Sequence, residues 1–124
     1  PIIPALNDHD VPRVLESAKE AGATDARYTL LRLPLTVEPV FREWLERTQP
    51  LRAEKVLERI RGTRDGKLND SSWGQRMTGS GEIADQIRSM FNVFRKKHGF
   101  RDLPKLVTDA FNPPTPNCGQ MSLF

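Results

Sequence analysis

The sequence predicts an α/β fold that is mostly helical, in which a βαβ unit is followed by three helices. Residues 1–4 and 26–34 are short, apolar, rich in β-formers and bounded by prolines, which indicates strands. Residues 10–22 between them, and three stretches within residues 36–98, repeat apolar residues at helical spacing. Parallel strands joined by a helix belong to a sheet covered on both faces, which two strands cannot form. We therefore expect a piece of a larger protein that begins inside a strand at Pro1 rather than at Met. A two-stranded ribbon beside a helical bundle is the alternative, although its strand edges would stay unpaired.

The composition is that of one soluble domain. The 124 residues are 37% hydrophobic and 28% charged, which allows one modest core. The formal charge of +3 comes from basic and acidic residues interleaved along the helices, so it is weak evidence for nucleic acid. No apolar run approaches the roughly 20 residues of a membrane helix, and we expect a cytoplasmic protein. Cys118 has neither a disulfide partner nor metal-ligand spacing, and His9 and His98 form no zinc motif.

The first predicted helix, within residues 10–22, has clear start and stop signals. Asp10 is a good N-cap, Pro12 fits the first turn, and Gly22 favours termination. The apolar residues at spacings of three and four share one face: Val11, Val14, Leu15, Ala18 and Ala21. This face must cover other apolar residues.

Three further helices are predicted over residues 36–49, 53–61 and about 82–98. Their inward residues are expected to be Val37, Val40, Phe41, Trp44 and Leu45 in the first, Ala53, Val56, Leu57 and Ile60 in the second, and Ile83, Ile87, Met90, Phe91 and Phe94 in the third. The glycine-rich residues 62–81 have no periodicity and predict a long ordered loop. The proline-rich residues 101–124 are expected to extend over the surface, with Leu123 and Phe124 as a terminal anchor.

Several segments follow one another in the order and spacing of a known family. Residues 1–8 read Pro-Ile-Ile-Pro-Ala-Leu-Asn-Asp, and residues 26–34 and 52–61 follow as a second strand-like segment and a helix. Further matching positions are Leu68-Asn69-Asp70-Ser71, Gly74, Arg76-Met77, Gly79 and Ser122-Leu123-Phe124. Together they resemble radical S-adenosylmethionine (radical SAM) proteins related to spore photoproduct lyase, a DNA repair photolyase-like group whose first matching strand reads P-I-I-P-G-L-N-D.

The resemblance implies the C-terminal piece of a partial (β/α) barrel. Residues 1–34 would be its last βαβ unit, residues 35–100 a helical C-terminal extension and residues 101–124 a tail. In this family the barrel holds S-adenosylmethionine and a [4Fe–4S] cluster, which is bound by three cysteines of a CxxxCxxC loop. This chain lacks that motif, and Cys118 cannot replace it. We therefore expect a radical SAM enzyme as the parent and an inactive fragment.

The resemblance also implies partners. The main partner would be the N-terminal barrel of the same chain, and DNA is a candidate substrate of the parent. Surface that this barrel would cover favours self-association of the isolated fragment. No membrane partner is expected.

Cofactor-binding residues follow from the same resemblance. Many radical SAM enzymes carry G-x-I-x-G-x-x-E on the penultimate strand, and Pro1, Ile3, Ala5 and Asp8 stand at its four positions here. Ile3 would then pack on the adenine, and Asp8 would support the loop that contains Ala5. The alternative is that Ile3 is a core residue and Asp8 a turn or cap residue.

Three residues at the end of the second segment complete the expected cofactor site. The backbone near Leu31, Arg32 and Leu33 would bind the adenine edge in such a protein. Arg32 also interrupts an apolar run, and a buried arginine needs a partner. Its side chain would meet an anionic cofactor or substrate group if it faced inward, and would be a solvated charge if it faced outward.

The glycine-rich loop contains the remaining candidate residues. An aromatic ring and a guanidinium suit contact with nucleic acid or phosphate, and Arg76 is the candidate substrate-binding residue. Trp73 is expected to pack on a helix as part of a plain connector. The alternative function is a non-catalytic helical module that binds nucleic acid or another protein.

Overall fold

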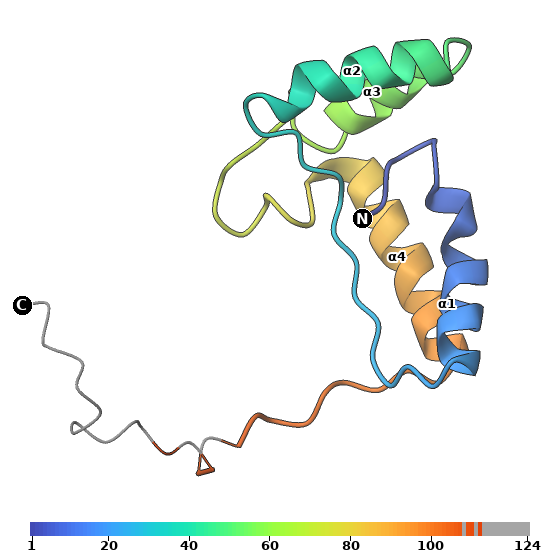
Figure 1. The fold of residues 1–124 in the computed structure, drawn as a ribbon, viewed down its shortest axis with the longest axis vertical. Coiled ribbons are helices and arrows are strands. Elements are labelled where there is room, and N and C mark those ends of the chain that lie inside the picture. The colour runs from blue at the N-terminus through green and yellow to red at the C-terminus, as the bar shows by residue number, and fades with distance from the viewer. Residues whose placement is uncertain (108, 111, 113–124) are drawn as a thin grey trace, which may run out of the picture.

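The regular secondary structure of the chain is helical throughout the part that the structure describes. This computed structural model describes residues 1–107, 109, 110 and 112. A short 3-10 helix, η1 (Asp8–Asp10), leads into α1 (Val11–Glu20), and α2 (Val37–Thr48), α3 (Ala53–Arg61) and α4 (Gly81–Lys97) follow. Helices α1 and α4 pack on one another, and α2 packs on α3 as a second pair (Figure 1).

The expected βαβ unit, and with it the piece of a (β/α) barrel, is wrong. The two predicted strands do meet in parallel, since the Ile2 N–H donates to the Thr29 carbonyl (2.8 Å) and the Leu31 N–H to the Ile2 carbonyl (2.9 Å). They form only one isolated bridge, between Ile2 and Leu30, and the described residues contain no strand.

Local chemistry explains why this pairing stops after one bridge. The Ile3 N–H donates to the Asn7 Oδ1 (2.7 Å), and Pro4 has no N–H that could continue a ladder of backbone hydrogen bonds. The chain then turns, with the Leu6 N–H donating to the Ile3 carbonyl (3.0 Å). On the other edge of residues 26–34, the Leu30 N–H donates to the Met77 carbonyl in a loop (2.8 Å). No further segment therefore adds to the bridge as a strand.

The four helices were predicted to within one or two residues of their ends. Helix α1 begins directly after Asp10 and α2 directly after Thr36, as the cap signals indicated. Neither side chain makes a capping hydrogen bond, however. The positions of the helix ends are thus confirmed, and the expected role of these two side chains is wrong.

The core consists of two apolar clusters. The first lies mainly between α1 and α4 and comprises Ile2, Val11, Leu15, Leu30, Ala84, Ile87, Phe91 and Phe100. The second is built on α3 and one side of α2 and comprises Leu33, Leu45, Ala53, Val56, Leu57, Ile60 and Leu68. The extended segment of residues 26–34 contributes Leu30 to one cluster and Leu33 to the other, so it connects the two helix pairs.

The predicted inward face of α2 is buried only in part. Leu45 is fully buried and Phe41 packs at the edge of the second cluster. Val40 is 66% exposed, and Val37 and Trp44 are exposed as well. Among the described helices, α2 packs mainly on α3, so only a narrow stripe of the helix is buried.

The loop between α3 and α4 is held in place by a buried arginine. Arg64 is 1% exposed, and its Nη2 donates to the carbonyls of Leu31 (2.8 Å) and Arg76 (3.2 Å). Gly79 adopts φ +70° against Thr63 and Leu30, where a Cβ would lie 2.7 Å from the Thr63 carbonyl oxygen. These contacts confirm the prediction of an ordered loop.

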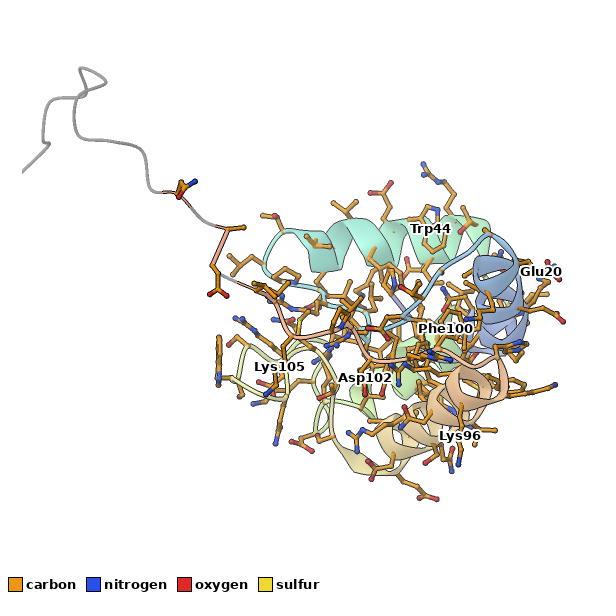
Figure 2. The ribbon with its side chains drawn as sticks, turned by 90° about the horizontal axis from the view of Figure 1, so that it is seen from below. Glu20, Trp44, Lys96, Phe100, Asp102 and Lys105 are labelled. Carbon is orange, nitrogen blue, oxygen red and sulfur yellow. The ribbon has the colours of Figure 1, made fainter. Side chains whose placement is uncertain are left out.

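The chain beyond α4 is attached by the Arg95 guanidinium, by a hydrogen bond from the Arg101 N–H to the Thr24 carbonyl (3.0 Å) and by a buried ring. The Arg95 Nη2 donates to both Asp25 (2.6 Å) and Asp102 (2.7 Å), and Phe100 is buried in the first cluster (Figure 2). Residues 101–107 have no regular structure and are exposed, as expected for the start of the tail. The predicted anchor residues Leu123 and Phe124 lie outside the described residues, as does Cys118. Within the part of the chain that is described, no helix has both the length and the apolar character to cross a bilayer.

Candidate functional site

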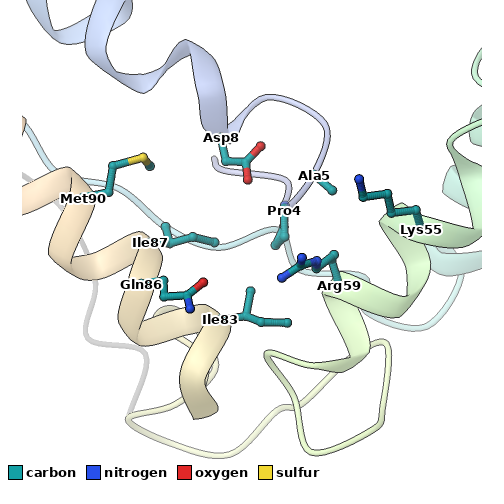
Figure 3. Close-up of a pocket in the computed structure, with 9 residues that line it drawn as sticks. All are labelled: Pro4, Ala5, Asp8, Lys55, Arg59, Ile83, Gln86, Ile87 and Met90. Atoms are coloured by element: carbon teal, nitrogen blue, oxygen red, sulfur yellow. The ribbon is translucent and has the colours of Figure 1, made fainter.

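A pocket of about 460 Å³ opens where the N-terminal turn, α3 and α4 meet (Figure 3). Its volume is in the range of small-molecule sites. The residues that line it come from all three elements: Pro4, Ala5, Asp8, Lys55, Arg59, Ile83, Gln86, Ile87 and Met90.

The turn that forms one wall is built by local hydrogen bonds. The Asn7 side chain accepts from the Ile3 N–H and donates to the Pro1 carbonyl (3.3 Å), which fixes the entry to the turn. Ala5 adopts φ +62°, a left-handed conformation that residues with a Cβ rarely take. Arg52 reaches back from the start of α3 and donates from Nη2 to the Ala5 carbonyl (2.6 Å). This bond ties the turn to α3, and η1 then presents Asp8 to the pocket.

The opposite wall carries two cations. Lys55 and Arg59 lie four residues apart on α3 and therefore on one face of the helix. Within the described residues, neither forms an ion pair at 4.0 Å or less, whereas the nearby Glu54 pairs with Arg61 at 3.5 Å. The α3 wall therefore presents two positive charges without a neutralising partner from its own helix.

Helix α4 supplies the apolar floor and one amide. Ile83, Ile87 and Met90 line the pocket on one face of α4, where Ile87 also belongs to the first cluster. Gln86 adds a side-chain amide whose Nε2 donates weakly to Glu82 (3.4 Å). The pocket thus combines an apolar floor with a carboxylate on one side and two cations on the other.

The six residues expected to bind the cofactor do not come together in this pocket. Ala5 and Asp8 line it, but the Ile3 and Leu31 side chains pack against the second cluster and Leu33 is part of it. The Leu31 backbone is also in use, because its N–H donates to Ile2 and its carbonyl accepts from Arg64. The core interpretation of Ile3 agrees with this packing. As folded here, the six residues do not fit one S-adenosylmethionine site.

Arg32 lies elsewhere, against the loop between α3 and α4. Its Nη1 approaches the Met77 sulfur at 3.8 Å, and its Nε is buried without a partner among the described atoms. Its charge also acts on the buried Arg64, whose pKa is lowered mainly by burial, with Asp70 opposing and Arg32 adding to the effect. Arg32 therefore belongs to the region that fixes the loop and does not line the pocket.

Arg76 and Trp73 form a separate feature at the tip of that loop. The Arg76 guanidinium lies 4.6 Å from the centre of the Trp73 ring, and Trp73 is 86% exposed. The expectation that Trp73 packs on a helix is wrong, because nearly all of its side chain is exposed to solvent. This pair stands apart from the pocket.

No site role was predicted for Lys55, Arg59 and Gln86, which also line the pocket. One signal was available in the sequence, since Lys55 and Arg59 are like charges four residues apart on a predicted helix, a spacing at which they repel each other. For metal sites, the described residues contain no group of three His, Cys, Asp or Glu side chains that could hold an ion. Comparison of the chain with protein-family models, curated proteins and solved structures finds no match.

Proposed function

We propose that this chain is the C-terminal region of a radical SAM enzyme similar to spore photoproduct lyase. One observation supports the proposal: segments that carry the resemblance, far apart in sequence, bond to one another. Ile2 forms one bridge with Leu30, the Arg52 side chain donates to the Ala5 carbonyl, and the Leu30 N–H donates to the Met77 carbonyl. A resemblance scattered by chance along the chain would not be expected to gather its segments in this way.

The backbone at Ala5 adds to this support. The similar motif has glycine at this position, and glycine adopts positive φ without the steric cost that a Cβ brings. The φ of +62° at Ala5 is the geometry that such a glycine would favour. The backbone at Ala5 is therefore compatible with the glycine of the similar motif, although this chain carries alanine.

In the parent enzyme, one region would bind the iron–sulfur cluster and the present chain would contribute to the cofactor site. A CxxxCxxC loop elsewhere in the parent would bind the [4Fe–4S] cluster, which would supply reducing electrons for chemistry on S-adenosylmethionine. Ala5 and Asp8 are the members of the expected cofactor set that remain open to a ligand in this chain. The chain alone would be inactive, and the parent would act in the cytoplasm.

Anaerobic reconstitution of the intact parent with iron and sulfide tests the proposal. We expect the absorbance of a [4Fe–4S] cluster and, after reduction, the release of 5′-deoxyadenosine from S-adenosylmethionine. The present chain, treated in the same way, is the matched control and should gain neither. A parent that assembles no cluster would contradict the proposal.

The exposed Trp73 and Arg76 pair favours a second candidate, a nucleic-acid-binding module. A solvent-exposed ring beside a guanidinium can stack on a base while the cation approaches phosphate. We expect the Trp73→Ala variant to bind a single-stranded oligonucleotide about tenfold more weakly in fluorescence anisotropy. Trp44→Ala, which changes the tryptophan of α2, is the control. An oligonucleotide affinity that is the same for Trp73→Ala and the unmodified chain, and that does not fall as the salt concentration rises, would argue against this candidate.

A further inference from the structure

We propose that the pocket between the N-terminal turn, α3 and α4 binds a small organic anion, with its phosphate or carboxylate group held by Lys55 and Arg59. The inference goes beyond the proposed function, which gives no role to these two cations. It requires neither an iron–sulfur cluster nor the parent protein.

The first argument is electrostatic. Lys55 and Arg59 share one face of α3 and repel each other, since like charges at this spacing destabilise a helix. Among the described residues, no carboxylate oxygen lies within 4.0 Å of the side-chain nitrogens of Lys55 or Arg59. Glu54, which is next to Lys55 in sequence, forms its ion pair with Arg61. An anion placed between the two cations would replace this repulsion with two charge-assisted hydrogen bonds.

The second argument concerns the body of the ligand. Next to the cations, the floor of the pocket is formed by Pro4, Ile83, Ile87 and Met90, which offer no hydrogen-bonding side chains. A bare inorganic ion would leave this surface in contact with water. An anion with an aromatic or aliphatic body would cover it and gain from its burial.

The third argument concerns orientation. Asp8 faces the pocket from η1, across from the α3 wall that carries Arg59 (Figure 3). Its negative charge disfavours an anionic group at that end, so the charged end of the ligand should face α3. Asp8 and the Gln86 amide can then accept hydrogen bonds from a hydroxyl or amino group at the far end of the ligand.

Phenyl phosphate is a suitable probe because it joins a phosphate to an apolar ring, and benzyl alcohol is its uncharged counterpart. In a ¹⁵N–¹H NMR titration of the 124-residue chain at low ionic strength, we expect saturable shifts at residues 5–8, 55–59 and 83–90. Benzyl alcohol should produce much smaller shifts there. Equal shifts with both compounds, or shifts spread over the whole surface, would overturn the proposal.

Charge variants separate a specific site from general attraction. Lys55→Gln and Arg59→Gln should each weaken phenyl phosphate binding about tenfold, and the double variant should lose saturable binding. Asp8→Asn should bind at least as tightly as the unmodified chain, because it removes a negative charge from the pocket. The double variant Lys96→Gln, Lys97→Gln removes the same charge from the far end of α4 and should bind unchanged. A loss of affinity in this control equal to that of the pocket variants would refute the site, as would unchanged affinity in the pocket variants. Lys55, Arg59, Lys96 and Lys97 are exposed, and Asp8 is half-buried. The NMR spectrum away from the pocket verifies that each variant is folded.

Discussion

The turn at Ala5 provides a sharp test, because replacing alanine with glycine there should stabilise the protein. Glycine usually lowers stability, since it has more backbone freedom to lose on folding. At Ala5 the native φ is +62°, where the methyl group crowds the backbone. The Ala5→Gly variant relieves this strain and should therefore raise the free energy of unfolding.

The expected gain is small and can be estimated from three contributions. A left-handed backbone costs a residue with a Cβ about 1–2 kcal/mol. The additional unfolded-state freedom of glycine offsets roughly 0.5–1 kcal/mol of this gain. The methyl group is only partly buried at the edge of the second cluster, so its loss costs a few tenths of a kcal/mol, by order of magnitude. We expect a net stabilisation of about 0.5 kcal/mol.

Ala18→Gly is the matched control, because it makes the same chemical change inside α1. Glycine in a helix costs about 1 kcal/mol relative to alanine, so Ala18→Gly should be less stable than the unmodified 124-residue chain. The free energies of unfolding of the two variants should therefore differ from each other by about 1.5 kcal/mol, with Ala5→Gly above and Ala18→Gly below the unmodified protein. Urea unfolding followed by circular dichroism at 222 nm measures this difference, provided that the slope of the transition is the same for all three proteins. If Ala5→Gly lowers stability as much as Ala18→Gly does, position 5 does not have the left-handed backbone described here.

Three further predictions concern the residues that hold the loop and the tail. Hydrogen bonds from Arg95 and, to a lesser degree, Arg27 lower the pKa of Asp25 to about 2. Asp25→Asn should therefore reduce the free energy of unfolding at pH 7. In urea titrations, the difference from the unmodified chain should shrink as the pH falls from about 4 toward 2, because Asp25 then becomes protonated. Gly79→Ala places a methyl group against a carbonyl at positive φ and should cost about 3 kcal/mol in thermal unfolding; a cost below that of Ala18→Gly would contradict the packing around this glycine. Arg64→Ala removes a buried side chain and two hydrogen bonds, so it should cost about 3 kcal/mol and speed amide exchange at Leu30; exchange unchanged at Leu30 would show that the arginine does not hold the loop.

The helices could be predicted because their signals are local. Apolar spacing along α3 identified all four of its buried residues, and the breakers around each helix set its ends. The strands could not be predicted in the same way, because a strand needs a partner along its length. Residues 26–34 have the composition of a strand, but they pair with Ile2 on one edge and with a loop carbonyl on the other. The composition of a segment indicates its preference for β-structure but not whether another strand lies beside it.

The candidate site shows the same limit. Ala5 and Asp8 were identified through a sequence motif, and both do line the pocket. Lys55 and Gln86 line the same pocket only because α3 and α4 approach the same turn, which no local pattern encodes. In the sequence, their polar side chains have the character of ordinary surface residues.

The two apolar clusters also differ in how much of the chain must exist before each can form. The second cluster draws its buried residues from Leu33 to Leu68, whereas the first needs Ile2 at one end and Phe100 at the other. During synthesis, the α2 and α3 pair can therefore acquire its core before α4 is made, whereas α1 must wait for α4 and Phe100. We expect an early, locally stabilised intermediate on the ribosome, with the N-terminal turn and its pocket assembled only after α4 has been made.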